Sequence, residues 1–137
     1  LVGIAGFGGA ADDALGDIGH YQTMAKWRDD FERRMLDQRS GIAVFGREAP
    51  RLGNTSCIAA LGKAAETMVM AFDIAGVAIS AGSACSSGKV KPSHVLESMG
   101  AGSRAGEAIR ISGGWATTQS DFETLADVFL QLYNQPA

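Results

Sequence analysis

Apolar side chains recur every three or four positions along several stretches of the chain, and this spacing predicts helices. Between Asp17 and Arg39 the apolar positions fall on one face, which is typical of a helix that packs against a core. That face consists of Tyr21, Met24, Trp27, Phe31 and Met35. The charged side chains of the same stretch are then expected to face largely outward; they are Lys26, Arg28, Asp29, Arg33 and Arg34.

A second amphipathic helix is expected at the end of the chain. Thr118 and Asp121 have the three-residue spacing with which side chains and backbone N–H groups satisfy each other at a helix start. A buried stripe follows, formed by Phe122, Leu125, Phe129 and Leu132. Shorter or less regular helices are predicted over Lys63 to Phe72, over Ser93 to Met99, and over the Ala- and Gly-rich stretch from Leu1 to Leu15, which we expect to be at least partly buried.

Four short β-prone runs lie between these helices, at Ile42 to Phe45, Thr55 to Leu61, Val77 to Ser80 and Ala108 to Ser112. In the last run the side chains alternate, so Ile109 and Ile111 share one face and Arg110 lies on the other. Helices that alternate with short strands indicate an α/β fold with two layers, in which helices cover one sheet. Residues 1–137 fit a single small domain.

Composition narrows the possible functions. Apolar residues make up 46% and charged residues 20% of the 137 positions, which is the profile of a globular protein. A net charge of −3 offers no basic field for nucleic acid, and no apolar stretch predicts a membrane span or a signal peptide. The two cysteines are not spaced as zinc ligands or as a disulfide framework, so we expect no metal site and a reducing, cytoplasmic location. Because the chain starts at Leu1 rather than Met, we expect a fragment or a processed form.

The stretch AGSACSSGKVKPS, from Ala81 to Ser93, is the candidate for chemistry. Small residues around Cys85 leave the thiol accessible, and Lys89 and Lys91 add positive charge that favours the reactive thiolate. The alternative on these grounds is a surface cysteine in an ordinary loop. Cys57, by contrast, lies in an apolar strand and is expected to be a buried, inert thiol.

Several motifs together resemble one enzyme family. They are, in chain order, GIAGFGGAADDA at the start, RLGNT, the E-x-x-x-M-A-x-D run from Glu66 to Asp73, GVAIS, SAGSACSSGKVKPSHVLESMG, and IRIS followed by Thr117 and Thr118. Their order and spacing over nearly all of the chain are similar to the C-terminal part of NifS/IscS-like cysteine desulfurases, which are pyridoxal-phosphate enzymes of fold type I in the class V aminotransferase family. The resemblance implies a C-terminal small domain with a short, mostly antiparallel sheet.

The resemblance also implies a reaction and its residues. In the family, a thiolate attacks the sulfur of L-cysteine bound to pyridoxal 5'-phosphate, alanine leaves, and a persulfide passes to an iron–sulfur scaffold or another acceptor protein. Cys85 matches that thiol, and it would contact a scaffold or cluster only transiently. Arg110 matches the arginine that binds the substrate carboxylate, whereas on physical grounds alone it could be a strand arginine in a surface ion pair. Asn54 matches a P-N-T region and is expected to order the backbone near the site. The complete enzyme is expected to be a homodimer.

The chain departs from the family pattern at several positions. None of its lysines stands in the histidine–lysine motif that holds the cofactor, so the cofactor-binding half is expected to be absent and the chain alone inactive. Gly53 replaces the usual proline before Asn54, Gly113 replaces a leucine, and Trp115 replaces an arginine, changes that bear on the geometry behind Arg110. Two alternatives remain: another class V enzyme, such as a selenocysteine lyase or an aminotransferase, and a non-enzymatic module that presents a thiol loop to a scaffold.

Overall fold

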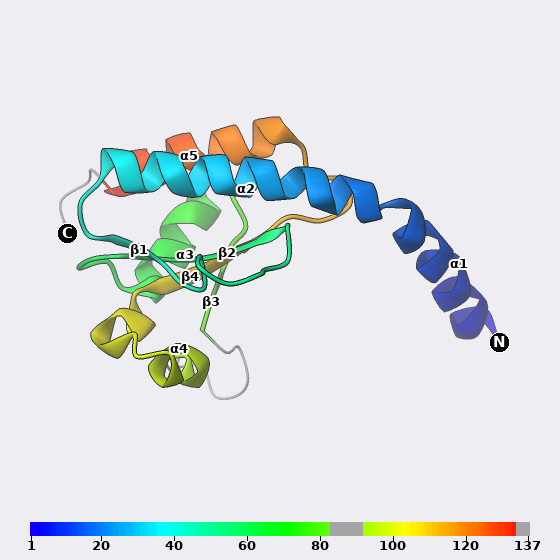
Figure 1. The fold of residues 1–137 in the computed structure, drawn as a ribbon, viewed down its shortest axis with the longest axis horizontal. Helices are drawn as coiled ribbons and strands as arrows, with labels where there is room; N and C mark the ends of the chain where they lie inside the picture. The colour runs from blue at the N-terminus through cyan, green and yellow to red at the C-terminus, as the bar shows by residue number, and fades with distance from the viewer. Residues whose placement is uncertain (83–91, 134–137) are drawn as a thin grey trace.

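The computed structural model describes residues 1–82 and 92–133, which form a small α/β fold (Figure 1). Its elements in chain order are α1 (Val2–Gly16), α2 (Ile18–Gln38), β1 (Ile42–Val44), β2 (Thr55–Ala60), α3 (Ala65–Ile74), β3 (Ser80–Ala81), α4 (His94–Ser98), the 3-10 helix η1 (Gly102–Gly106), β4 (Ala108–Ser112) and α5 (Gln119–Tyr133).

The strands form one four-stranded sheet in the order β1-β2-β4-β3, and each neighbouring pair is antiparallel. Helices α2 and α5 lie side by side on one face of this sheet (Figure 1). The shorter α4 and η1 pack on the other face, where Leu96 and Ala105 meet Ala59 and Ala108 of the central strands. The predicted fold class, a short antiparallel sheet covered by helices, is therefore confirmed.

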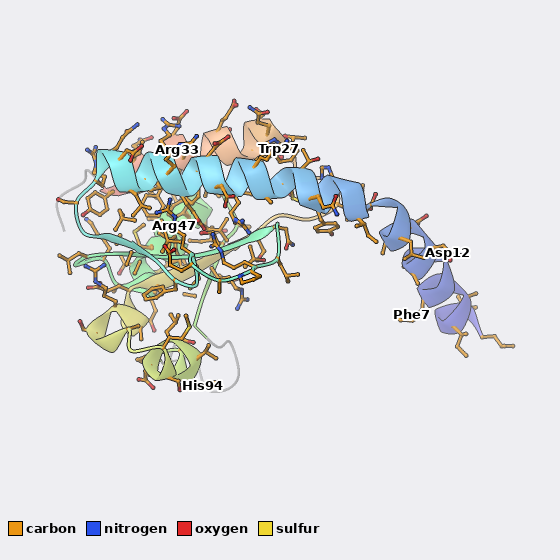
Figure 2. The ribbon with its side chains drawn as sticks, in the orientation of Figure 1. Phe7, Asp12, Trp27, Arg33, Arg47 and His94 are labelled. Carbon is orange, nitrogen blue, oxygen red and sulfur yellow. The ribbon has the colours of Figure 1, made fainter. Side chains whose placement is uncertain are left out.

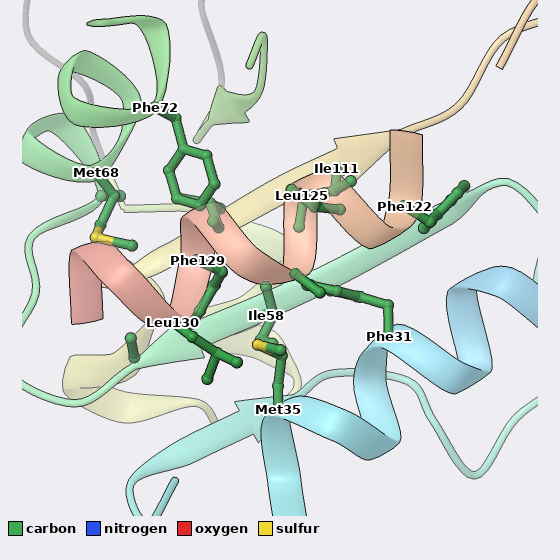
Figure 3. Close-up of a cluster of buried hydrophobic side chains, with 14 of the residues drawn as sticks. Phe31, Met35, Ile58, Met68, Phe72, Ile111, Phe122, Leu125, Phe129 and Leu130 are labelled. Atoms are coloured by element: carbon green, nitrogen blue, oxygen red, sulfur yellow. The ribbon is translucent and has the colours of Figure 1, made fainter. Parts of the chain in front are cut away.

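The main core lies between the sheet and the helices α2, α3 and α5 (Figure 3). Alternation along the central strands directs Ile58, Ile109 and Ile111 into it, as the pattern of β4 predicts. The helices contribute Met24, Phe31, Met35, Met68, Phe72, Phe122, Leu125, Ala126, Phe129 and Leu130. Most of the predicted stripe of α5 is buried, but Leu132 is only half-buried, and Ala126 and Leu130 complete the buried face instead.

The outward orientation expected for the charged residues of α2 is wrong for Arg28. Its side chain is buried and donates hydrogen bonds to the backbone carbonyl of Leu52 and to the carboxylate of Asp29. Because the guanidinium carries several donors on a long stem, it can pack against the core while its polar end remains paired. The face of α2 that packs toward the sheet therefore includes a paired polar side chain as well as the apolar stripe.

The expected burial of the first helix is also wrong. Residues Val2–Gly16 are helical, as predicted, but every side chain in α1 is exposed. Figure 1 shows α1 extending away from the layers, and Phe7 and Asp12 project from it (Figure 2). Apolar composition predicts burial only where another surface covers the helix, and no other described element does so. None of the described helices has the length and apolarity needed to cross a membrane.

The segments on either side of residues 83–91 differ in how well they were predicted. Ser93 caps α4 by accepting a hydrogen bond from the backbone N–H of Leu96, as expected. The strand predicted from Val77 pairs with its neighbour only at Ser80 and Ala81, although Val77 and Ile79 still pack against the core. The 3-10 helix η1 was not predicted, because its small residues show no periodic alternation of apolar and polar positions.

Gly53 lies where the connection between β1 and β2 crosses α2. A Cβ atom at this position would stand 2.2 Å from the backbone carbonyl oxygen of Tyr21, which cannot move aside without bending the helix. The close approach explains a glycine where the family has a residue with a Cβ. We expect Gly53→Ala to lower the free energy of unfolding by about 1–3 kcal/mol, measured by urea denaturation.

The matched control is Gly106→Ala in η1, where the added Cβ meets no atom within 4 Å. Its effect should stay within about 0.5 kcal/mol. Equal stability losses in the two variants would show that the approach of Gly53 to α2 does not constrain the fold.

Candidate functional site

Arg110 lies in the middle of the sheet, on the face opposite the main core. Its cross-strand neighbours are Cys57 on β2 and Ser80 on β3. Ile109 and Ile111 point to the other face, as the alternation predicts, and the Arg110 side chain is exposed. No residue within 1–82 or 92–133 forms an ion pair or a side-chain hydrogen bond with it. Its guanidinium therefore has donors available for an anion.

A surface pocket of about 350 Å³ opens beside this side chain. Arg110 and Cys57 contribute its polar groups from the sheet, and Val95 of α4 and Met99, which follows that helix, contribute part of its apolar wall. The remaining lining comes from Phe45, Gly46, Gly82, Ser93, Leu96, Ala108 and Ile109. A guanidinium beside an apolar wall is suited to a small ligand that carries a carboxylate.

Cys57 was expected to be a buried thiol, but it is only half-buried and lines this pocket. As a residue of the sheet face opposite the main core, it packs beside Leu96 and Ala105 and is still in contact with the pocket. Burial raises the pKa of the Cys57 thiol, and the positive charge of Arg110 partly opposes that rise. The thiol is therefore mainly protonated at neutral pH.

Asn54 connects the ends of the two central strands. Its side-chain Nδ2 donates a hydrogen bond to the carbonyl of Gly113 over 2.8 Å, and the Gly113 N–H donates to the Asn54 carbonyl over 2.8 Å. A Cβ at Gly113 would lie 2.7 Å from the sulfur of Met24, so a larger residue here would require the buried Met24 side chain to shift. The reciprocal bonds fix the backbone three residues after Arg110, the ordering role expected for Asn54.

A buried ionic network lies on the other side of the same strands. Glu32 is 1% exposed and accepts two hydrogen bonds of 2.8 Å from the guanidinium of Arg51 and one of 2.6 Å from the Ser56 hydroxyl. The bond with Glu32 is the main cause of the raised pKa of Arg51. Ser56 precedes Cys57 in β2, so the network connects α2 to the strand beside Arg110. The apolar pattern of the sequence does not predict this network, although Glu32 lies four residues after Arg28 and three before Met35, on one helix face.

Other predicted residues are not placed by the structure. Cys85, Lys89 and Lys91 lie outside the described residues. In the described part of the chain, no three His, Cys, Asp or Glu side chains gather as metal ligands. No lysine lines the pocket beside Arg110, so the described residues offer no Schiff-base partner for pyridoxal phosphate there.

Comparison with known proteins decides the family. A family model described as aminotransferase class-V matches residues 1–125, which is most of the chain. The chain belongs to the class-V aminotransferase family. Among its class-V relatives, a cysteine desulfurase of Cereibacter sphaeroides is 37% identical over 136 residues, and one of Gluconacetobacter diazotrophicus is 36% identical over 128 residues. The matches cover 98% and 92% of this chain.

A solved class-V relative has the same architecture. The X-ray structure of a NifS-like protein from Rickettsia africae has a TM-score of 0.80 and 28% sequence identity, over 96% of this chain and 34% of that protein. The chain spans about a third of the length of the relatives it matches, 35% and 32% for the two desulfurases. The resemblance to part of a NifS/IscS-like enzyme is thus confirmed.

Proposed function

We propose that residues 1–137 form the C-terminal small domain of a pyridoxal-phosphate-dependent cysteine desulfurase. The observation that carries the proposal is the arrangement around Arg110: a guanidinium without an anionic partner among the described residues, beside a pocket that Gly82 and Ser93 also line. These two residues flank the segment that carries Cys85. The desulfurase relatives supply the reaction for which such an arrangement is suited.

In this proposal Arg110 binds the carboxylate of L-cysteine. Two parallel charge-assisted hydrogen bonds from the planar fork would attract the substrate and fix its orientation at once. Cross-strand pairing on both sides holds the backbone of Arg110, and Asn54 with Gly113 fixes the strand end. Because the backbone that carries Arg110 is already ordered, no loop has to become ordered when the substrate binds.

Cys85 is the proposed sulfur acceptor. Its thiolate attacks the substrate sulfur, the bond between that sulfur and the carbon chain breaks, and the products are a persulfide on Cys85 and alanine. Gly82 precedes Cys85 by three residues and lines the Arg110 pocket. The persulfide would then pass to an iron–sulfur scaffold or another acceptor protein.

The cofactor would be held by a part of the complete enzyme that this chain does not contain. None of the described lysines lines the Arg110 pocket, and in this proposal residues 1–137 contribute substrate binding and sulfur acceptance. We propose that the complete enzyme is a cytoplasmic homodimer and that the chain alone is inactive.

The proposal is tested by mapping sulfur in the full-length enzyme. After incubation with L-cysteine, alanine should form, and mass spectrometry of the trapped persulfide should locate it on the peptide with Cys85 and not on the peptide with Cys57. The 137-residue chain with added pyridoxal phosphate is the control and should release no alanine. Alanine without a persulfide on Cys85 would favour another class V reaction, and a full-length protein with no turnover would favour a module that only presents a thiol.

A further inference from the structure

The proposed reaction leaves one reactive group of the pocket without a role. Cys57 is half-buried, lines the same pocket of about 350 Å³ as Arg110, and is its direct cross-strand partner. Side chains of such a pair lie on the same sheet face with Cβ atoms roughly 5 Å apart. The pair therefore places a carboxylate-binding group and a thiol on the same side of one pocket.

We propose that Cys57 and Arg110 together form a modification site for small disulfides that carry a carboxylate, such as cystine. The inference rests on the carboxylate binding proposed for Arg110, but it needs neither Cys85 nor turnover. Arg110 would hold the carboxylate of the disulfide, and the sulfur of Cys57 would attack the bound reagent.

The chemistry is thiol–disulfide exchange. Cys57 loses its proton, its sulfur attacks one sulfur of the disulfide, and the original sulfur–sulfur bond breaks. A mixed disulfide forms on Cys57, and the second half leaves as a thiolate that takes up a proton. The small disulfide is the oxidant, so the exchange is balanced without another reactant.

Selectivity comes from the carboxylate rather than from the thiol itself. Burial keeps Cys57 largely protonated, so reagents without a carboxylate should react with it slowly. A reagent held by Arg110 gains a high local concentration next to the sulfur, which offsets the small fraction of thiolate. The attached group would then pair with Arg110 and fill the pocket, so that substrate is excluded until a reducing thiol removes the group.

The test uses the Cys85→Ser variant of the chain, in which Cys57 is the only remaining thiol. Its rates of alkylation by iodoacetate and by iodoacetamide are compared at one pH. Both reagents consume the same thiolate, so the ratio of the rates is independent of the thiol pKa and reports the effect of the carboxylate. We expect the ratio to fall roughly tenfold or more when Arg110→Gln is added.

Two controls separate this effect from general charge and from loss of the fold. Arg33→Gln removes a guanidinium from the exposed ion pair with Asp30 on α2 and should leave the ratio unchanged. In urea the ratios of the chains with and without Arg110 should become equal, because unfolding separates β2 from β4.

The disulfides themselves give the second measurement. Cystine should form a mixed disulfide on Cys57 faster than cystamine, which has no carboxylate, and Arg110→Gln should remove that preference. If Arg110→Gln leaves the alkylation ratio unchanged, or if cystamine reacts as fast as cystine, the proposal is wrong. Neither result bears on sulfur transfer to Cys85, since no turnover takes place in this variant.

Discussion

Replacing Arg110 with alanine in the full-length enzyme is expected to raise KM for L-cysteine by roughly tenfold to a thousandfold, since a bidentate charge-assisted contact is lost. The side chain is exposed on the sheet face and has no described ion-pair partner, so its removal leaves no buried charge behind. Stability should therefore change little while substrate binding weakens. Steady-state kinetics of alanine release over a range of L-cysteine concentrations measure the effect.

Arg110→Lys is the informative companion, because lysine keeps the charge but not the planar fork of donors. It should recover only part of the lost affinity. Arg33→Ala, which removes an exposed arginine from α2, is the control and should leave KM unchanged. An unaltered KM in Arg110→Ala would exclude Arg110 from the substrate site.

Glu32→Ala is expected to lower the free energy of unfolding by about 3–5 kcal/mol. Glu32 is buried and accepts hydrogen bonds from Arg51 and Ser56. Its removal leaves the guanidinium of Arg51 without its bidentate partner and Ser56 with an unpaired hydroxyl, and desolvated polar groups without partners are costly. Urea denaturation of the 137-residue chain measures the change.

Asp30→Ala on the same helix is the matched control. Asp30 pairs with Arg33, but both side chains are more than 60% exposed, so water and salt screen the interaction. The expected loss is about 0–1 kcal/mol. Similar losses in Glu32→Ala and Asp30→Ala would show that the Glu32 network does not hold α2 to the strands.

The sequence predicted the two long core helices well because their apolar positions repeat with the helical period. Phe31 and Met35 of α2 and Phe122 and Phe129 of α5 are buried as expected. The pattern failed where burial depends on a partner rather than on polarity. Arg28 and Glu32 are buried because Leu52, Arg51 and Ser56 satisfy them, and those partners are distant in the sequence.

The candidate site was predictable only in part. Alternation within one strand was enough to place Arg110 opposite Ile109 and Ile111. The position of Cys57 beside it depends on the register between β2 and β4, which single-strand patterns do not contain. The thiol was therefore expected to be buried and inert, whereas it is half-buried and lines the Arg110 pocket. The role of Cys85 stays a prediction, because this residue lies outside the described part of the chain.

The alternation of β4 also limits how the length of this domain can vary. Ala108–Ser112 pairs residue by residue with β2, and the reciprocal bonds between Asn54 and Gly113 close that ladder at its end. Deleting or inserting one residue within β4 would turn the guanidinium of Arg110 into the apolar core and bring an isoleucine to the pocket face. The number of residues between η1 and Gly113 therefore determines on which face of the sheet the Arg110 side chain lies.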